Sequence, residues 1–335
     1  MAITPAALEE GVVADATGAE PVAGKSPTQI ALRRLRKDKV AMFCAFLVLV
    51  MTVLAILAPV ITGAMNIYWD VSHPDAPTGS EVLDVYGFPI IGPPFNGFTW
   101  EHPLGLAPRT GSDNLAYLLY GLRTSMIVAF SAAVLSTFIG VVIGLVSGFS
   151  RGWVDRVLSF ITDMFLSFPS LLAMLALAPI IVSHFGGNLD LLGTVQFVTL
   201  IVILVIFGWM SLARLIRGQV LSLREREFIQ AAEVIGVPTR QILFKELLPN
   251  LIAPIVITLS LNLPAFVALE AGLSFLGLGL SDIPSLGKMV SDARTYYSDY
   301  PLFLWVPVAA IGVLTLALNL LGDSVRDAFD PRTRR

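Results

Sequence analysis

Long runs of apolar residues, separated by shorter polar segments, dominate the chain. A helix that crosses ~30 Å of hydrocarbon at 1.5 Å per residue needs ~20 mostly apolar residues. Six stretches approach or exceed that length, and we predict a membrane helix in each: residues 40–61, 122–149, 157–182, 197–215, 251–276 and 303–321. The third stretch is interrupted by Phe168-Pro169. The pattern therefore predicts an all-α polytopic membrane protein.

Composition points the same way. The chain is 55% hydrophobic and only 14% charged, against roughly 25% charged in a soluble domain. This excludes a disordered or nucleic-acid-binding protein and argues against a soluble enzyme, and the net charge of −3 gives no attraction to nucleic acid. The lone Cys44 excludes an internal disulfide, and the three histidines are too scattered to indicate a metal site.

Lysine and arginine fix the expected orientation, because they are enriched in cytoplasmic connections. The segment between the first two runs, 62–120, holds Arg109 as its single basic residue against six acidic ones. The connection 218–250 and the C-terminal segment are rich in arginine. Five basic residues lie directly before the first run, within 33–39: Arg33, Arg34, Arg36, Lys37 and Lys39. We therefore predict that both termini are cytoplasmic, and that the first run is an anchored helix rather than a cleaved signal peptide.

These features divide the chain into five parts. Residues 1–28 are predicted to be a disordered cytoplasmic tail, and 29–62 the basic flank with the first helix. Residues 63–118 are an external loop whose proline, glycine and aromatic content predicts turns and short strands, in the form of a lid or scoop. Residues 119–322 carry the other five helices, and 323–335 form a cytoplasmic tail.

The cytoplasmic connection 218–250 is predicted to be a short helix–turn–helix. Good helix formers run over 225–234 and end at Gly236-Val237-Pro238, and a second helical stretch, 239–248, precedes Pro249. Gly236 permits the positive φ that ends a helix, and Pro249 suits the first turn of the next one. A plain amphipathic loop would share some of these features.

The connection resembles the EAA loop of type I ABC-importer permeases. That pattern is matched by Ala231 and Ala232, then Gly236, then Leu248-Pro249. It departs in having Gln230 where the family has glutamate, and Glu246 where an apolar residue is usual. Small alanines let a partner surface approach the helix closely. The resemblance implies that an ATPase contacts these residues: Phe228, Gln230, Ala231, Ala232, Gly236, Val237, Leu248 and Pro249.

Other segments are similar to the C-type permease subunits of dipeptide and oligopeptide importers. They are the first helix with its flank (31–59), HPLG (102–105), LLYGLRTS (118–125), the Phe168-Pro169 step, EAGLSFLGLG (270–279), PSLGKMVSDAR (284–294) and LLGDSVRDAFDPR (320–332). One stretch, LAPRTGSDN (106–114), departs from the T-D-x-x-G-R-D run usual in the family. That departure leaves the role of this stretch, and its bearing on the substrate, open.

The resemblance implies the type I ABC importer fold and a set of partners. It implies a heterodimer with a homologous permease, two cytoplasmic ABC ATPases that bind ATP with Mg, and an extracytoplasmic binding protein that delivers peptide. It also places the chain among the lipids of a bacterial cytoplasmic membrane. The chain itself is expected to hold no catalytic, cofactor or metal site. Gly24-Lys25-Ser26 is not a P-loop, because Ala19 stands where the first glycine is required.

Several alternatives stay open at this stage. The same architecture could import glutathione or chelated nickel, because the external binding protein usually sets the substrate. An ion-coupled carrier or channel would show internal repeats or more charges at membrane depth. A membrane enzyme would need a nucleophile–base pair or a metal motif, and we find neither in the sequence.

Two acidic residues and one proline stand out within the predicted spans. Asp163 and Glu270 are costly in hydrocarbon, so each is expected either to line the peptide path or its gate, or to form an interhelical or interfacial contact. Pro169 would permit a kink in a moving helix or a static bend. Gly140, Gly144 and Gly148 form a small-residue stripe that predicts close helix packing.

Overall fold

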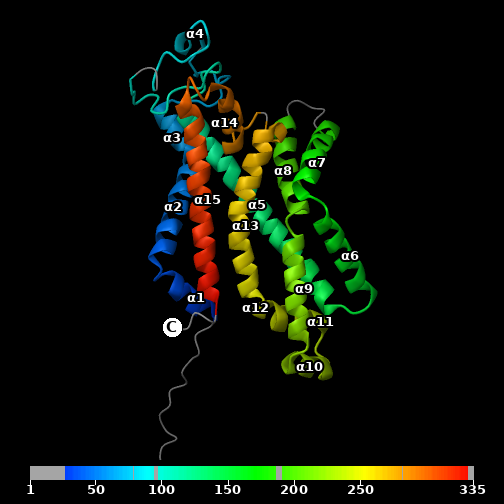
Figure 1. Cartoon of the computed structure of the whole chain (residues 1–335). Coiled ribbons are helices and arrows are strands. Elements are labelled where there is room, and N and C mark those ends of the chain that lie inside the picture. Colours follow the sequence, from blue (N-terminus) through cyan, green and yellow to red (C-terminus); the bar gives the residue numbers. More distant parts are fainter. Residues whose placement is uncertain (1–26, 78, 94–96, 186–190, 281, 331–335) are drawn as a thin grey trace, which may run out of the picture.

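Five helices in the described part of the chain are long and apolar enough to cross a membrane, and a bent pair forms a sixth span. The computed structural model describes residues 27–77, 79–93, 97–185, 191–280 and 282–330. Each of the six predicted stretches corresponds to one span (Figure 1). The spans are α2 (Lys39–Ile56), α5 (Asn114–Phe149), the bent pair α6 (Trp153–Ser167) and α7 (Ser170–Phe185), α8 (Leu192–Ile206) with α9 (Met210–Arg224), α13 (Ile252–Leu273) and α15 (Pro301–Phe329).

The bend in the third span falls where the sequence places its interruption. α6 and α7 meet at 90°. Phe168 has φ −79° and ψ 137°, an extended conformation that steric contact with the following Pro169 favours over the helical one. The local sequence alone therefore explains why this span is two helices.

A second break, between α8 and α9, was not predicted. It falls at Phe207, Gly208 and Trp209. A Cβ on Gly208 would lie 2.5 Å from Cζ of Phe266, in the middle of α13, and 2.7 Å from the carbonyl oxygen of Leu204. The glycine therefore leaves room for the ring of Phe266, which the apolar pattern of one segment cannot reveal.

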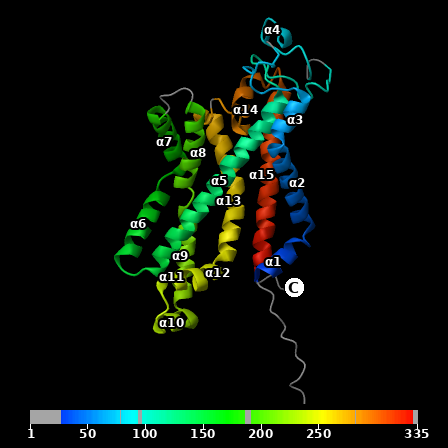
Figure 2. The same cartoon turned by 180° about the vertical axis from the view of Figure 1, so that it is seen from behind.

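α5 crosses the bundle diagonally and joins its two sides (Figure 2). The predicted glycine stripe packs directly on α9. A Cβ on Gly144 would lie 2.7 Å from the carbonyl oxygen of Ala213, and one on Gly148 would lie 2.7 Å from Cβ of Val220. Both distances are below any normal contact, so the stripe provides the close helix packing that we predicted.

The end of the bundle that holds the 62–113 region carries little regular structure. The short helices α3 (Ala58–Met65) and α4 (Gly79–Val82) lie there among turns. The described residues form two isolated β-bridges and no strand, so the expected short strands are absent from this part of the chain. Asp113, which is buried, caps α5 by accepting a hydrogen bond from the Ala116 amide, and it also contacts His102 Nδ1 at 2.7 Å. This cap starts the helix earlier than the expected loop boundary.

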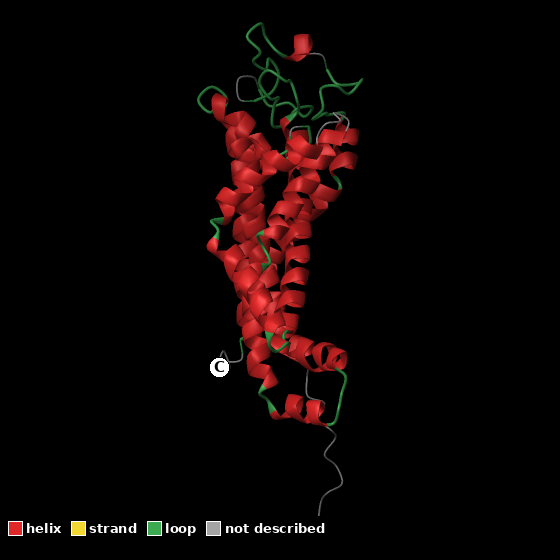
Figure 3. Ribbon diagram, turned by 90° about the vertical axis from the view of Figure 1, so that its right-hand side faces the viewer, coloured by secondary structure: helices red, strands yellow, loops and turns green. Residues whose placement is uncertain are grey.

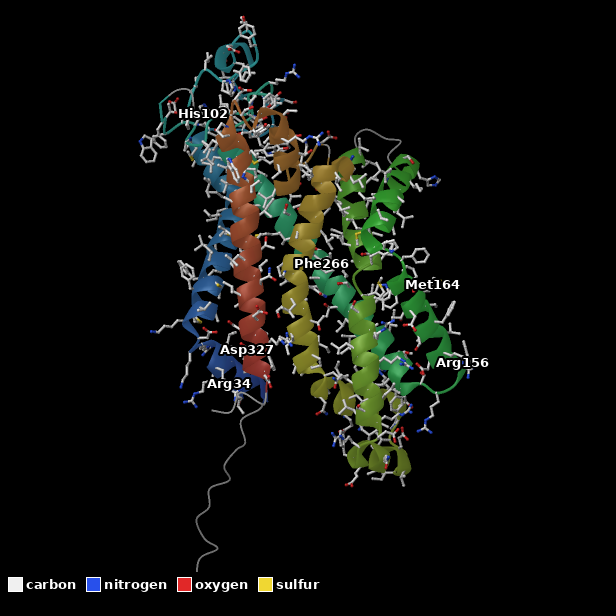
Figure 4. All side chains as sticks on the ribbon, in the orientation of Figure 1. Arg34, His102, Arg156, Met164, Phe266 and Asp327 are labelled. Atoms are coloured by element: carbon white, nitrogen blue, oxygen red, sulfur yellow. The ribbon has the colours of Figure 1, made fainter. Side chains whose placement is uncertain are left out.

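The opposite end gathers α1 (Pro27–Leu35), the last turns of α15 and the 218–250 connection (Figures 1 and 4). Asp38 caps α2, and its other carboxylate oxygen accepts a hydrogen bond from Ser324 at 2.8 Å. These bonds lower the pKa of Asp38 below its ordinary value, with Ser324 the main cause. α15 continues as a helix through Phe329, within the segment assigned to the tail. Residues 1–26 and 331–335 lie outside the described part.

Candidate functional site

The 218–250 connection projects beyond the end of the bundle as a compact helical unit (Figure 3). It begins with the end of α9 and continues through α10 (Glu227–Val234), α11 (Thr239–Gln241), the π-helical turn η2 (Ile242–Leu247) and α12 (Leu248–Asn250). The predicted helix–turn–helix is therefore present. Pro249 lies in α12, just before α13 begins at Ile252.

Gly236 ends α10 in the way that its position predicts. Its φ is +83°, in the left-handed region. The Val237 amide donates to the Ala232 carbonyl at 3.0 Å, and the Gly236 amide donates to the Glu233 carbonyl at 3.1 Å. This pair of bonds is a Schellman motif, which satisfies carbonyls that a helix end otherwise leaves unpaired. The motif reverses the chain tightly after α10.

One face of the unit is held against the bundle by an apolar cluster. Ile229 is fully buried and packs with residues of α5, α9, η2 and the residue before α13: Leu145, Leu212, Ile216, Val220, Ile242, Leu247 and Leu251. Ala232 and Val237 are half-buried against the same cluster. Ala232 therefore faces the protein's own interior, whereas Ala231 is exposed. We did not predict a role for Ile229 from the sequence, although the i, i+3 spacing of Ile229 and Ala232 places both on one helical face.

The other face of the unit is apolar and open. The side chains of Val234 and Ile235 are 87% and 80% exposed, and Phe228 is 45% exposed. Phe244 and Lys245 line an adjoining open groove of about 390 Å³ together with Pro238, Arg240 and Gln241. Apolar side chains this exposed, gathered beside polar ones, are characteristic of a protein-binding surface. We call Phe228, Ala231, Val234 and Ile235 the exposed α10 face.

Charged contacts join the unit and the neighbouring helices. Arg217 of α9 makes two hydrogen bonds with Asp155 of α6, at 2.7 and 2.9 Å. Asp155 also accepts from the hydroxyls of Ser147 and Ser159. Beyond them, Arg151 in the α5–α6 turn lies 3.7 Å from the carboxylate of Glu233 on α10. A displacement of α10 thus has both apolar and ionic contacts through which to reach α5, α6 and α9.

The three residues proposed for a path or gate lie apart from one another. Asp163 accepts a hydrogen bond from Arg214, and both line a polar groove of about 220 Å³ between α5, α6 and α9. Pro169 starts the segment after the 90° bend. Glu270 is fully buried, so in this structure it faces neighbouring helices rather than an open surface. Their part in transport stays a prediction.

Two family models match the chain. One, "Binding-protein-dependent transport system inner membrane component", matches residues 140–335 and includes the whole 218–250 unit. The other, "N-terminal TM domain of oligopeptide transport permease C", matches residues 26–76.

Individual proteins of named function are similar over most of the chain. The oligopeptide transport system permease protein OppC of Bacillus subtilis is 30% identical over 99% of both chains. The dipeptide transport system permease protein DppC of Alkalihalophilus pseudofirmus is 32% identical, over 92% of this chain and 91% of the relative. A solved structure of the MetNI methionine ABC transporter, facing inward, shares the fold with a TM-score of 0.50 and 20% identity, over 64% of this chain and 96% of that one.

Proposed function

Because the chain belongs to the family of binding-protein-dependent transport system inner membrane components, we propose that it is a permease subunit of an ATP-driven importer of di- and oligopeptides. It forms half of the translocation path in the cytoplasmic membrane and pairs with a homologous permease. ATP and Mg bind to two cytoplasmic ATPases, and an external binding protein delivers the peptide. The peptide substrate is supported by relatives that are named as oligopeptide and dipeptide permeases.

The observation that carries the proposal is the two-sided 218–250 unit. Its inner face, centred on Ile229, is fixed to the bundle, and its exposed α10 face is apolar and uncovered in the single chain. A rigid element fixed on one side and free on the other is suited to transmit force from a partner. We therefore assign the exposed α10 face to contact with an ATPase subunit.

In this mechanism, nucleotide-driven closure of the ATPases displaces α10. The displacement passes through the Ile229 cluster to α5 and α9, and through the Arg217–Asp155 pair to α6. The spans then shift between a state open to the binding protein and a state open to the cytoplasm. The assignment also puts the start of α1 and the end of α15 on the cytoplasmic side, because both lie at the same end of the bundle as the 218–250 unit (Figure 1).

The test places a charge on the exposed α10 face and measures how much ATPase co-purifies with the membrane complex of two permeases and two ATPases. Val234→Asp should keep the permease in the membrane but lower the amount of ATPase that is retained, by about tenfold or more, because a carboxylate would be desolvated in an apolar contact. Peptide uptake into proteoliposomes should fall with it.

A matched control is available at the other end of the molecule. Val85 is 94% exposed in the 62–113 region, and Val85→Asp should retain wild-type amounts of ATPase. Equal retention by Val234→Asp and wild type would contradict the assignment of this face. If the wild-type complex imports no peptide with any binding protein supplied, the importer function itself is wrong.

A further inference from the structure

Glu270 is a completely buried carboxyl group near the end of α13 that faces the 62–113 region. The Ser274 hydroxyl donates a hydrogen bond to Glu270 Oε1 at 2.8 Å. Oε2 makes no hydrogen bond of normal geometry with any residue that the structure describes. A buried and incompletely bonded carboxyl group is destabilising, more so at membrane depth. Packing alone therefore does not account for a glutamate at this position.

Two further serine hydroxyls lie beside this carboxyl group, and each belongs to a different element. Ser125 lies on α5, and Ser285 is the N-cap of α14 (Leu286–Ala293). The Ser125 hydroxyl accepts from the Leu286 amide, and the Ser285 hydroxyl accepts from the Lys288 amide, each at 3.2 Å. Because both hydroxyls use a lone pair to bind the first turn of α14, their protons remain available for the carboxyl group. Ser125 thereby joins α5 to the start of α14, and the Glu270 carboxyl group lies where these two elements meet α13.

Glycines bring the backbones of these three elements into direct contact around Glu270. A Cβ on Gly287 of α14 would lie 2.4 Å from the carbonyl oxygen of Ala271, next to Glu270. A Cβ on Gly121 of α5 would lie 3.1 Å from the carbonyl carbon of Ser285. The start of α14 is therefore seated on both helices at van der Waals distance, with the carboxyl group beside it.

The other side of α14 contacts the 62–113 region. Met289 and Ala293 are fully buried in a cluster with Ala107, Tyr300 and Phe303. The segment that joins α13 to α14 is irregular, since it contains a π-helical turn, η3 (Ser274–Leu278), and Gly277 at φ +84°. α14 is thus a short helix that follows an irregular connection (Figure 1). Polar contacts hold its start against α5 and α13, and apolar residues pack on its other side. Such an element is suited to take two discrete positions.

We propose that Glu270 is a positioning residue of an outer gate, which with Ser125, Ser274 and Ser285 holds α14 against α5 and α13. Opening toward the binding protein requires this contact to separate. The proposal rests on the importer function proposed above and adds the element that the binding protein must release. Glu270 acts through α14 and need not touch peptide.

The test compares serine variants of the reconstituted complex. Both Ser125 and Ser136 are fully buried on α5, but among the described residues Ser136 bonds only the Ala133 carbonyl of its own helix. Ser125→Ala and Ser285→Ala should raise ATP hydrolysis measured without binding protein by about threefold or more, because they remove a bond that favours the closed position. Ser136→Ala should leave this basal rate unchanged. If these serines served only the stability of the fold, their replacement would lower the yield of complex without raising its basal rate of ATP hydrolysis.

A second readout follows α14 directly. In a Cys44→Ser background, Met289→Cys places a thiol on the buried face of α14. Its labelling by a membrane-impermeant maleimide should be severalfold faster when Glu270→Ala is added. Basal hydrolysis and labelling that both stay at the wild-type level in Ser125→Ala, Ser285→Ala and Glu270→Ala complexes would overturn the gate. That result, with intact wild-type uptake, would leave the importer function standing.

Discussion

Ile229 and Phe228 are neighbours on α10 whose side chains lie on different faces of the helix, and they separate the two roles of the 218–250 unit. Ile229 is fully buried in the apolar cluster, whereas Phe228 is 45% exposed. Truncating a buried isoleucine to alanine costs ~2–5 kcal/mol, through lost burial and the cavity left behind. Since Ile229 docks α10 on the bundle, Ile229→Ala should weaken that docking by at least ~2 kcal/mol, which is roughly a 30-fold change in the local opening equilibrium.

Hydrogen exchange of the purified chain measures this opening. The amides of 230–236 should exchange roughly 30-fold faster in Ile229→Ala than in wild type, while those of α13 stay protected. Phe228→Ala should leave the exchange unchanged, because Phe228 is not part of the cluster that docks α10, but it should weaken retention of the ATPase. Unchanged exchange in Ile229→Ala would refute the reasoning that this cluster docks the unit, and so would equal acceleration by both variants.

Three other predictions follow from local geometry. In Gly236→Ala the new Cβ has open space around it, so the variant should destabilise the end of α10 by ~1–2 kcal/mol through the positive φ alone. Gly236→Asn should cost less, and hydrogen exchange at the Val237 amide measures the effect of each variant. Gly144→Leu should lower the thermal stability of the detergent-solubilised chain severely, because its Cβ would overlap Ala213 and Ile216, whereas Gly312→Leu in open space should not. Burial raises the pKa of Tyr300 to about 12. The stability that the buried neutral phenol gives the fold should be present below pH 10 and be lost as the pH rises through 12. An absorbance titration of wild type against Tyr300→Phe checks this.

The sequence predicted the spans well because each is defined by local hydropathy and length. Gly236 and the Phe168-Pro169 bend were equally predictable, since both depend on the backbone preferences of one or two residues. The break at Gly208 was not, and the close contact that requires a glycine there is with the ring of Phe266, which is distant in sequence. The inward orientation of Ala232 likewise depends on which side of α10 packs against the bundle. Residue spacing within α10 does not determine that tertiary contact.

The central claim is that the exposed α10 face meets a nucleotide-hydrolysing partner. Ile235 and Tyr86 are both 80% exposed. Ile235 directly follows α10 and Tyr86 follows α4, and these helices lie at opposite ends of the molecule (Figure 1). The two residues thus form a matched pair for cysteine cross-linking in a Cys44→Ser background. In membranes that contain the assembled complex, Ile235→Cys should cross-link to an ATPase subunit, in an amount that changes when ATP is added. Tyr86→Cys should give no such product. An Ile235→Cys permease that imports peptide but never cross-links to an ATPase would contradict the account.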